Sequence, residues 1–239
     1  MKSKPTCRQR GFTLLETVIA IGVLAVLLTG FMVVFTPAAD GIRKSINVQQ
    51  ADRLASALEL ELVTLRGATE TTKYKTGFNK SFEWIGNQST AKDALLIYQY
   101  RGKTSSLRTD DQTPEPEPSL KDKLPGKDYV VVSMLRRRSD PKLEDDLKAV
   151  EGAVYLVKCT QLIFGGDQLI AGTAGGIKDP KTGNPAASAD DYPEAVIAFS
   201  AEFHMLPAKT ASYIAGPAFT AKFDSAQNPV FTRNLAVRR

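Results

Sequence analysis

Residues 12–36 read FTLLETVIAIGVLAVLLTGFMVVFT, an apolar run whose only charged side chain is Glu16. As an α-helix, these 25 residues would be about 37 Å long. That length exceeds the hydrocarbon core of a bilayer, which is roughly 30 Å thick. The run therefore predicts a membrane-spanning helix.

The ten residues at the start of the chain are basic. They contain no acidic residue and four cations: Lys2, Lys4, Arg8 and Arg10. Because cations concentrate on the cytoplasmic side of a spanning helix, we expect a single pass through the cytoplasmic membrane, with the N-terminus inside and residues after about position 40 exported. Without these four charges the formal net charge falls from +5 to +1. A nearly neutral remainder gives little reason to expect a nucleic-acid partner.

Glu16 needs an explanation, because a carboxylate in the middle of a membrane costs about 2.5–3.5 kcal/mol, and less near the interface. Residues 12–36 contain no Lys, Arg or His that could pair with it. We therefore expect its charge partner to come from another molecule.

Three simpler interpretations of the apolar run compete. A secretory signal peptide normally has an apolar region of only 7–15 residues followed by its cleavage site, although the small residues within Thr36–Ala39 would suit signal peptidase. A plain signal anchor leaves Glu16 unexplained. A buried helix of a soluble protein leaves it unpaired and gives the basic leader no role.

The residues around the predicted start of the helix, RGFTLLE at positions 10–16, resemble the class III signal of type IV prepilins and type II secretion pseudopilins. The resemblance implies cleavage between Gly11 and Phe12 by a membrane-bound prepilin peptidase and N-methylation of Phe12. It also implies that Glu16 meets the new terminal amine of a neighbouring subunit during assembly. Such pairing would offset the desolvation of both charges.

A second helical pattern follows the apolar run. Pro37 and Gly41 predict a kink or local melting, because proline removes a helical hydrogen bond. Residues 42–66 contain neither proline nor glycine. Their apolar residues recur at helical spacing, at Ile46, Ala51, Leu54, Leu58, Leu62 and Leu65. The charged residues lie largely off that face, at Arg53, Glu59, Glu61 and Arg66. The helix predicted at residues 42–66 should therefore pack its apolar face on a globular core.

The remainder of the chain predicts strands rich in β-branched and aromatic residues, at 94–100, 129–135, 153–158, 195–206, 218–223 and 230–237. No second long amphipathic helix is evident. We therefore predict an α+β, type IV pilin-like fold, in which the long N-terminal helix packs on a mainly antiparallel sheet. The expected parts are a leader at 1–11, a transmembrane and assembly helix at 12–41, and a globular head at 42–239 that begins with helix 42–66.

Two stretches of the head predict loops. Residues 103–127 contain TPEPEP at 113–118, whose alternating prolines favour an exposed, extended loop. Residues 165–191 are rich in Gly, Asn and Asp. Major pseudopilins hold calcium in a similar loop, and this loose resemblance implies Asp179, Asn184, Asp190 and Asp191 as candidate ligands. Nothing in their spacing arranges the six to eight oxygens that calcium requires, and Asp and Asn are ordinary turn formers. We predict no metal or other cofactor.

No catalytic arrangement stands out. His204, the only histidine, shares a predicted strand face with Ser200 and Glu202, but residues i and i+2 lie about 7 Å apart along a strand, too far for a catalytic triad. We interpret them as the polar face of a half-buried strand. Residues 136–138 are three arginines followed by acids, so their charges should be solvated and balanced locally. Cys159 lies in an apolar run and should be a buried, inert thiol.

The expected function is structural and non-enzymatic: a subunit of a type IV pilus-like filament or type II secretion pseudopilus, with a minor subunit favoured. Its expected partners are prepilin peptidase and its N-methyltransferase activity, other pilin or pseudopilin subunits, assembly-platform membrane proteins, and membrane lipid. The head would lie in the periplasm or outside the cell. The alternative is a single-pass anchored module that binds a ligand or mediates adhesion without polymerising. Glu16 distinguishes the two, because a mere anchor gains nothing from that charge.

Overall fold

The computed structural model describes residues 13–165, 168–225 and 228–239. These residues form two compact units, Met1–Ile46 and Asn47–Arg239. The predicted leader at 1–11 and Phe12 lie outside the described residues.

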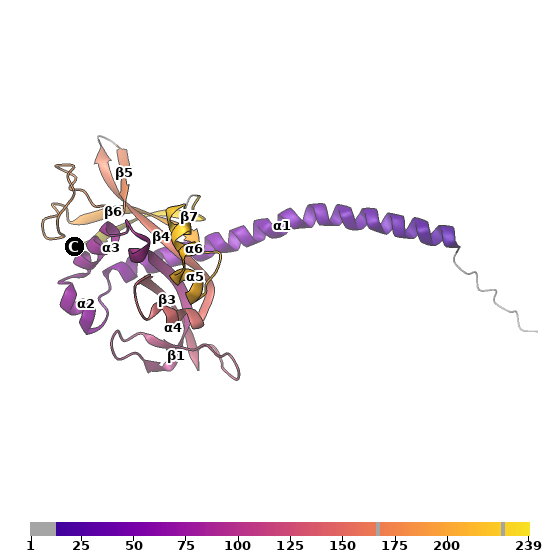
Figure 1. Cartoon of the computed structure of the whole chain (residues 1–239), viewed down its shortest axis with the longest axis horizontal. Helices are drawn as coiled ribbons and strands as arrows, with labels where there is room; N and C mark the ends of the chain where they lie inside the picture. The colour runs from indigo at the N-terminus through magenta and orange to yellow at the C-terminus, as the bar shows by residue number, and fades with distance from the viewer. Residues whose placement is uncertain (1–12, 166–167, 226–227) are drawn as a thin grey trace, which may run out of the picture. The chain divides into compact units, whose positions relative to one another are not determined.

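The helix α1 runs without interruption over Leu14–Val63 (Figure 1). It includes Pro37 and Gly41, so the local melting predicted at these residues does not occur. A single proline deprives a helix of one hydrogen bond at a cost of about 3 kcal/mol. The helical turns on both sides of Pro37 offset this cost, because a helix that is already nucleated gains a hydrogen bond with each added residue.

The second half of α1 supplies one wall of the core of the head. Its fully buried residues follow the predicted leucine face, at Ala51, Leu54, Ala55, Leu58 and Leu62. Ile46 is exposed instead, and Leu65 lies beyond the end of the helix, packed against the core. Glu61, which was predicted off the buried face, is also buried, because Arg66 Nε donates to its carboxylate at 3.1 Å. The ion pair allows a charged residue on a mostly apolar face.

A seven-stranded sheet forms the centre of the head. Its strands are β1 (Leu95–Leu107), β2 (Pro114–Pro116), β3 (Tyr129–Arg137), β4 (Val150–Gly165), β5 (Gln168–Ala174), β6 (Val196–Met205) and β7 (Phe231–Arg238). β1 pairs with β2, β3 and β4, β4 with β5 and β6, and β6 with β7. All six ladders are antiparallel, which confirms the predicted α+β architecture of a long helix on an antiparallel sheet.

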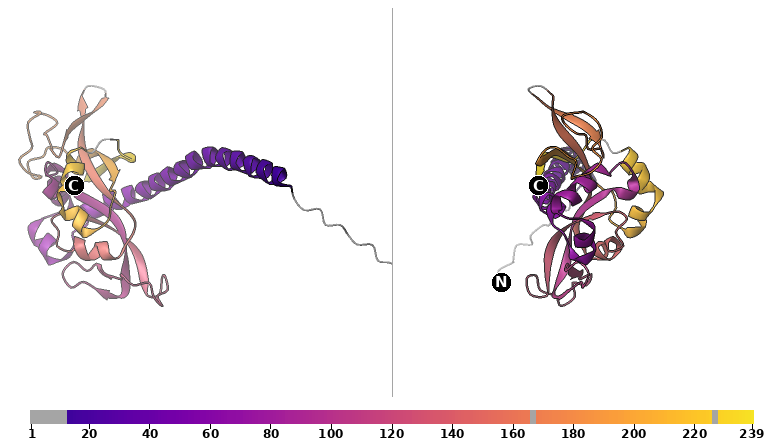
Figure 2. Two further views of the ribbon diagram at one scale, coloured as in Figure 1. Left: turned by 45° about the vertical axis from the view of Figure 1, so that its right-hand side comes forward. Right: turned by 90° about the vertical axis from the view of Figure 1, so that its left-hand side faces the viewer.

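Both faces of this sheet are covered. Alternate residues of β1 point to opposite sides, so that Ile97 belongs to the core with α1, whereas Tyr98 belongs to a second core. The first core also contains residues of α3 (Gly77–Gly86). The second is closed by α4 (Leu143–Lys148), α5 (Ala211–Ala215) and α6 (Pro217–Asp224). Figure 2 shows α5 and α6, in yellow, beside the sheet.

The short helices of the head were not predicted. Besides α3 to α6, they include α2 (Gly67–Lys73) and the 3-10 helix η1 (Ala91–Asp93). The predicted strand at 218–223 is wrong, since these residues lie in α6. Pro217 suits the first turn of a helix, where its missing N–H needs no partner. Phe219 and Phe223 are four residues apart and share the buried face of α6.

The two predicted loops also contain strands. Residues 103–127 include the end of β1 and all of β2, and Asp111, Thr113 and Glu117 are buried, so this segment is not simply an exposed loop. β5 lies in the second predicted loop and pairs with the far end of β4. The other predicted strands correspond to β1, β3, β4, β6 and β7.

Candidate functional site at the N-terminal signal and apolar helix

Thr13 and Glu16 form a reciprocal cap at the start of α1. The Glu16 carboxylate accepts hydrogen bonds from the Thr13 backbone N–H and from its hydroxyl, each at 2.9 Å. The Glu16 N–H donates in turn to Thr13 Oγ1 at 3.3 Å. This arrangement is a capping box, which satisfies backbone N–H groups that have no partner within the helix.

The cap changes the interpretation of Glu16. Sequence reasoning found no cation for it in the apolar run and expected an intermolecular partner. It missed Thr13, although Thr-x-x-Glu before an apolar run is the signature of a capping box. The carboxylate therefore has local hydrogen-bond donors within its own chain and needs no second molecule to satisfy it, although no opposite charge balances it there.

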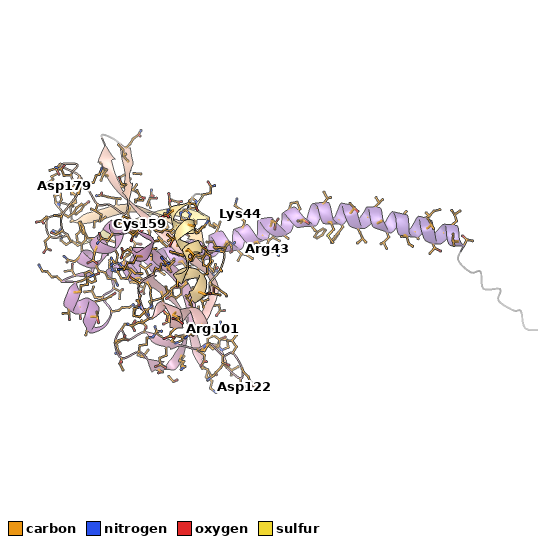
Figure 3. All side chains as sticks on the ribbon, in the orientation of Figure 1. Arg43, Lys44, Arg101, Asp122, Cys159 and Asp179 are labelled. Carbon is orange, nitrogen blue, oxygen red and sulfur yellow. The ribbon has the colours of Figure 1, made fainter. Side chains whose placement is uncertain are left out.

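The apolar half of α1 is exposed along its whole described length. Residues 13–46 are all exposed, and the most apolar 18-residue window of the helix has a mean hydropathy of 2.8. Side chains project from this part of the helix into open space (Figure 3). By length and composition α1 can cross a membrane. The predicted processing residues, Gly11 and Phe12, directly precede this segment but lie outside the described residues.

The four candidate calcium ligands take part in three separate sets of contacts, because Asp179 and Asn184 share one turn while Asp190 and Asp191 each bond elsewhere. The Asp179 carboxylate accepts from the Lys181 N–H at 2.8 Å, which keeps its pKa below the usual value. Asn184 offers its backbone carbonyl to the Asp179 N–H at 2.8 Å. Asp190 accepts from Lys75 Nζ at 2.8 Å and Asp191 from Ser188 Oγ at 2.7 Å. Within the described residues, no group of three or more His, Cys, Asp or Glu side chains gathers as a metal site would require.

His204 is buried, and not half-buried as predicted, because helices cover its face of the sheet. It lies directly opposite Leu156, which belongs to the second core, and its Nε2 is 3.4 Å from Glu202 Oε2. Burial lowers the pKa of the imidazole. Ser200 is four residues away on the same strand, about 13 Å along it, so the three residues do not form a triad.

The arginines at 136–138 are also placed differently from the prediction of a solvated run. Arg136 is buried and donates to Asp146 at 2.6 Å, to Asp140 at 2.9 Å and to Asp111 at 3.2 Å. Arg138 donates to the carbonyl of Ile214 at 2.7 Å. The charge of Arg136 is balanced by carboxylates as expected, but these ion pairs lie inside the head, so that Arg136 and Arg138 help to hold the fold together.

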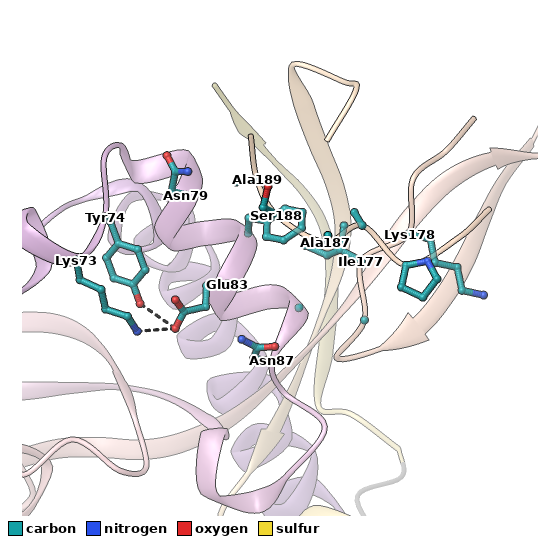
Figure 4. Close-up of a pocket in the computed structure, with 15 residues that line it drawn as sticks. Lys73, Tyr74, Asn79, Glu83, Asn87, Ile177, Lys178, Ala187, Ser188 and Ala189 are labelled. Carbon is teal, nitrogen blue, oxygen red and sulfur yellow. Dashed lines mark hydrogen bonds and ion pairs between the residues drawn. The ribbon is translucent and has the colours of Figure 1, made fainter. Parts of the chain in front are cut away.

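The head contains a cleft of about 490 Å³ between α3 and the segment 176–189 (Figure 4). Glu83 lines it, and its carboxylate turns toward Lys73 and Tyr74, from which it accepts hydrogen bonds at 2.7 Å and, from the Tyr74 hydroxyl, at 3.1 Å. Arg137 approaches the same carboxylate at 3.1 Å. These contacts lower the pKa of Glu83 against the opposing effect of its burial. The charge of this carboxylate is therefore already balanced by its own chain.

Comparison with known families identifies the N-terminal segment. A family model described as the prokaryotic N-terminal methylation motif matches residues 6–32. No curated protein and no solved structure matched the chain. The match includes Gly11, Phe12 and Glu16, on which the class III signal was recognised.

The matched motif is a substrate of an enzyme and not a catalytic site. Prepilin peptidase cleaves such signals and methylates the new N-terminus, and the apolar helix that follows is a membrane anchor. The head adds an antiparallel sheet packed on the second half of the same helix. The chain therefore carries the N-terminal methylation signal of type IV pilin-like precursors, which prepilin peptidase processes.

Proposed function

We propose that the chain is a structural subunit of a type IV pilus-like filament or a type II secretion pseudopilus. It is stored in the cytoplasmic membrane with its N-terminus inside and its head exported, and it is then packed helix to helix into the filament. One observation carries the proposal: an apolar helix begins with a carboxylate, and the exposed residues 13–46 leave that whole surface free for lipid or other helices.

Processing supplies the missing charge. Cleavage after Gly11 would create a terminal amine on Phe12, four residues before Glu16. In the membrane Thr13 holds the carboxylate of its own chain through hydrogen bonds. In the filament the amine of a neighbouring subunit would add an opposite charge where lipid and water are excluded. Such a pair offsets the desolvation that each charge would suffer alone.

We favour a minor subunit over a major one. The TLLE form at residues 13–16 is frequent among secretion pseudopilins, and the head lacks the paired cysteines that many major pilins use. Within the described residues Cys159 is a free, buried thiol. The second candidate function, an anchored binding module, is favoured only by the cleft beside α3.

Replacement of Glu16 tests the proposal. Glu16→Ala and Glu16→Gln should insert into the membrane at least as well as the natural chain, since they remove a charge from an apolar segment. Filament incorporation should fail, because a buried amine left without its partner costs on the order of 3–5 kcal/mol. Asp40 is the other acidic residue of the first unit, and it lies outside the apolar run. Asp40→Asn is therefore the matched control and should assemble normally.

The products are compared in membranes and in sheared filaments by immunoblotting and mass spectrometry. The mature chain should begin with methylated Phe12, and a bulky residue at Gly11 should leave the precursor uncut. An N-terminus at Ala39 or Asp40 would identify a secretory signal peptide instead. Filaments containing Glu16→Ala at the natural level would favour the anchored binding module.

A further inference from the structure

The part of α1 within the first unit carries few charges, and they lie near its two ends. Between residues 14 and 46 the charged residues are Glu16, Asp40, Arg43 and Lys44. Arg43 and Lys44 are exposed neighbours on α1, as Figure 3 shows by their labels. Arg43 approaches Asp40 only at 3.9 Å, and the two side chains are 80% and 70% exposed. A contact so long and so exposed leaves the guanidinium open to other anions.

Their spacing along α1 matches the dimensions of a bilayer. The helix is continuous from Leu14 to Val63, so Glu16 and Arg43 lie about 40 Å apart along its axis. A bilayer including its headgroups is roughly 40–45 Å thick. When the apolar residues up to Phe35 fill the hydrocarbon core, Glu16 lies near one interface and the backbone of Arg43 lies about 12 Å beyond the core on the other side. The long side chains of Arg43 and Lys44 lean toward the N-terminus of the helix and so reach back to the headgroups.

We propose that Arg43 and Lys44 bind lipid phosphates of the exported leaflet and thereby set the depth of α1 in the membrane before assembly. This proposal rests on the N-inside orientation given above. The guanidinium has a planar set of donors that matches a phosphate, and the ammonium is a compact cation. Asp40 offsets only one of the two charges, so the site retains a net positive charge that complements phosphate.

The contact has a direct consequence for assembly. A subunit that enters a filament moves outward, and this movement takes Arg43 and Lys44 away from the phosphates. The cations thus retain unassembled subunits at one depth until other subunits replace the lipid contacts. Acidic side chains of a neighbouring subunit could bind the same two cations in place of lipid phosphate. The experiment therefore uses isolated subunits, in which lipid phosphate is the available partner.

The test measures the depth of a fluorophore attached at Ala38→Cys in the full processed chain. The protein is placed at low density in vesicles of phosphatidylethanolamine and phosphatidylglycerol, and lipids with spin labels at different depths quench the fluorophore. Arg43→Gln/Lys44→Gln should let the fluorophore move outward by up to about one helical turn, ~5 Å, because the phosphate contacts no longer hold the helix. Arg43→Glu/Lys44→Glu should move it further outward, because phosphate repels the new carboxylates.

Two controls separate electrostatics from general damage. Arg53→Gln changes an exposed cation in the second unit and should leave the fluorophore depth unchanged. High salt should reduce the difference between the Gln and Glu variants by screening their charges. Equal depth in the natural, Gln and Glu proteins would overturn the proposal. A depth that changes only when subunits are crowded would assign the cations to a neighbouring subunit.

A wrong N-inside orientation would be detected by a different measurement from the depth of the fluorophore. In that case an impermeant thiol reagent added outside sealed vesicles or spheroplasts would not reach a cysteine placed in the head, whatever residues occupy positions 43 and 44. The depth measurement and the orientation measurement can therefore fail independently.

Discussion

The ammonium of Lys80 on α3 donates a hydrogen bond to the backbone carbonyl of Thr64, 2.7 Å away, just beyond the last residue of α1. The same ammonium pairs with Glu70 of α2 at 2.9 Å and lies over the ring of Trp84. Lys80 is only 2% exposed, and this burial lowers its pKa. One buried cation thus joins three consecutive helices.

We expect Lys80→Met to destabilise the head by roughly 2–4 kcal/mol, because the side chain keeps its volume but leaves the Thr64 carbonyl without its donor and removes the cation that balances Glu70. The Glu70 carboxylate keeps its hydrogen bond from the Arg66 N–H. The measurement is urea unfolding of a head fragment that starts at Arg43, since both cores lie within Asn47–Arg239. Lys75→Met is the matched control, because its ion pair with Asp190 is exposed. Equal losses in the two variants would contradict the role assigned to Lys80.

Acid should weaken the head through His204. Its folded-state pKa lies below the ordinary value of 6.5, so the folded head binds this proton less readily than the unfolded chain. Burial is the main cause of the lowered pKa; Lys158 on β4 and Lys222 on α6 lower it further, and Glu202 on the same strand opposes them. Stability should be constant above pH 6.5 and should fall as the pH drops below that value.

The control for this effect is His204→Leu, which should be nearly independent of pH between 7 and 5. Carboxylates with a lowered pKa, such as Glu83, lose their stabilising charge only at lower pH, so they do not affect this window. Urea unfolding at pH 7.5, 6 and 5 provides the measurement. The same pH dependence in both proteins would assign the effect to another group.

Cys159 should be unreactive in the folded head. The thiol is fully buried, and burial raises its pKa to about 12. Because the thiolate is the nucleophile, a disulfide reagent at pH 8 should modify Cys159 only when the head unfolds. The reaction rate should therefore rise with urea in parallel with unfolding. Rapid modification of the folded head would show that this part of the core is open.

Thr13→Val should loosen the first turn of α1, because it removes the hydroxyl that bonds to Glu16 while keeping the branched side chain. Loss of such a cap costs about 1 kcal/mol. Backbone hydrogen exchange in lipid nanodiscs should therefore become several-fold faster at residues 14–17. Thr13→Ser keeps the hydroxyl and should exchange like the natural chain. Unchanged exchange in Thr13→Val would mean that lipid, and not the capping box, holds this turn.

Features that depend on residues close together in the sequence were predictable from the sequence alone. The apolar run at 12–36, the motif at 10–16 and the leucine face of the second helix are one-dimensional patterns. Their interpretation follows from helix geometry and bilayer thickness, which do not depend on the rest of the fold. The family model matches residues 6–32, and α1 is helical over the apolar run from Leu14 and over most of the second pattern, to Val63. The capping box at Thr13 was equally readable but was overlooked.

Burial in the head depended on residues far apart in sequence, and only the tertiary structure determined it. The segment 218–223 reads as a strand until α6 is seen to place Phe219 and Phe223 on the second face of the sheet. His204 is buried because that same face is covered. Arg136 can be buried because Asp111 and Asp146 arrive from other elements to balance it. A local pattern specifies which residues can share a face, whereas the packing of distant elements determines whether water reaches that face.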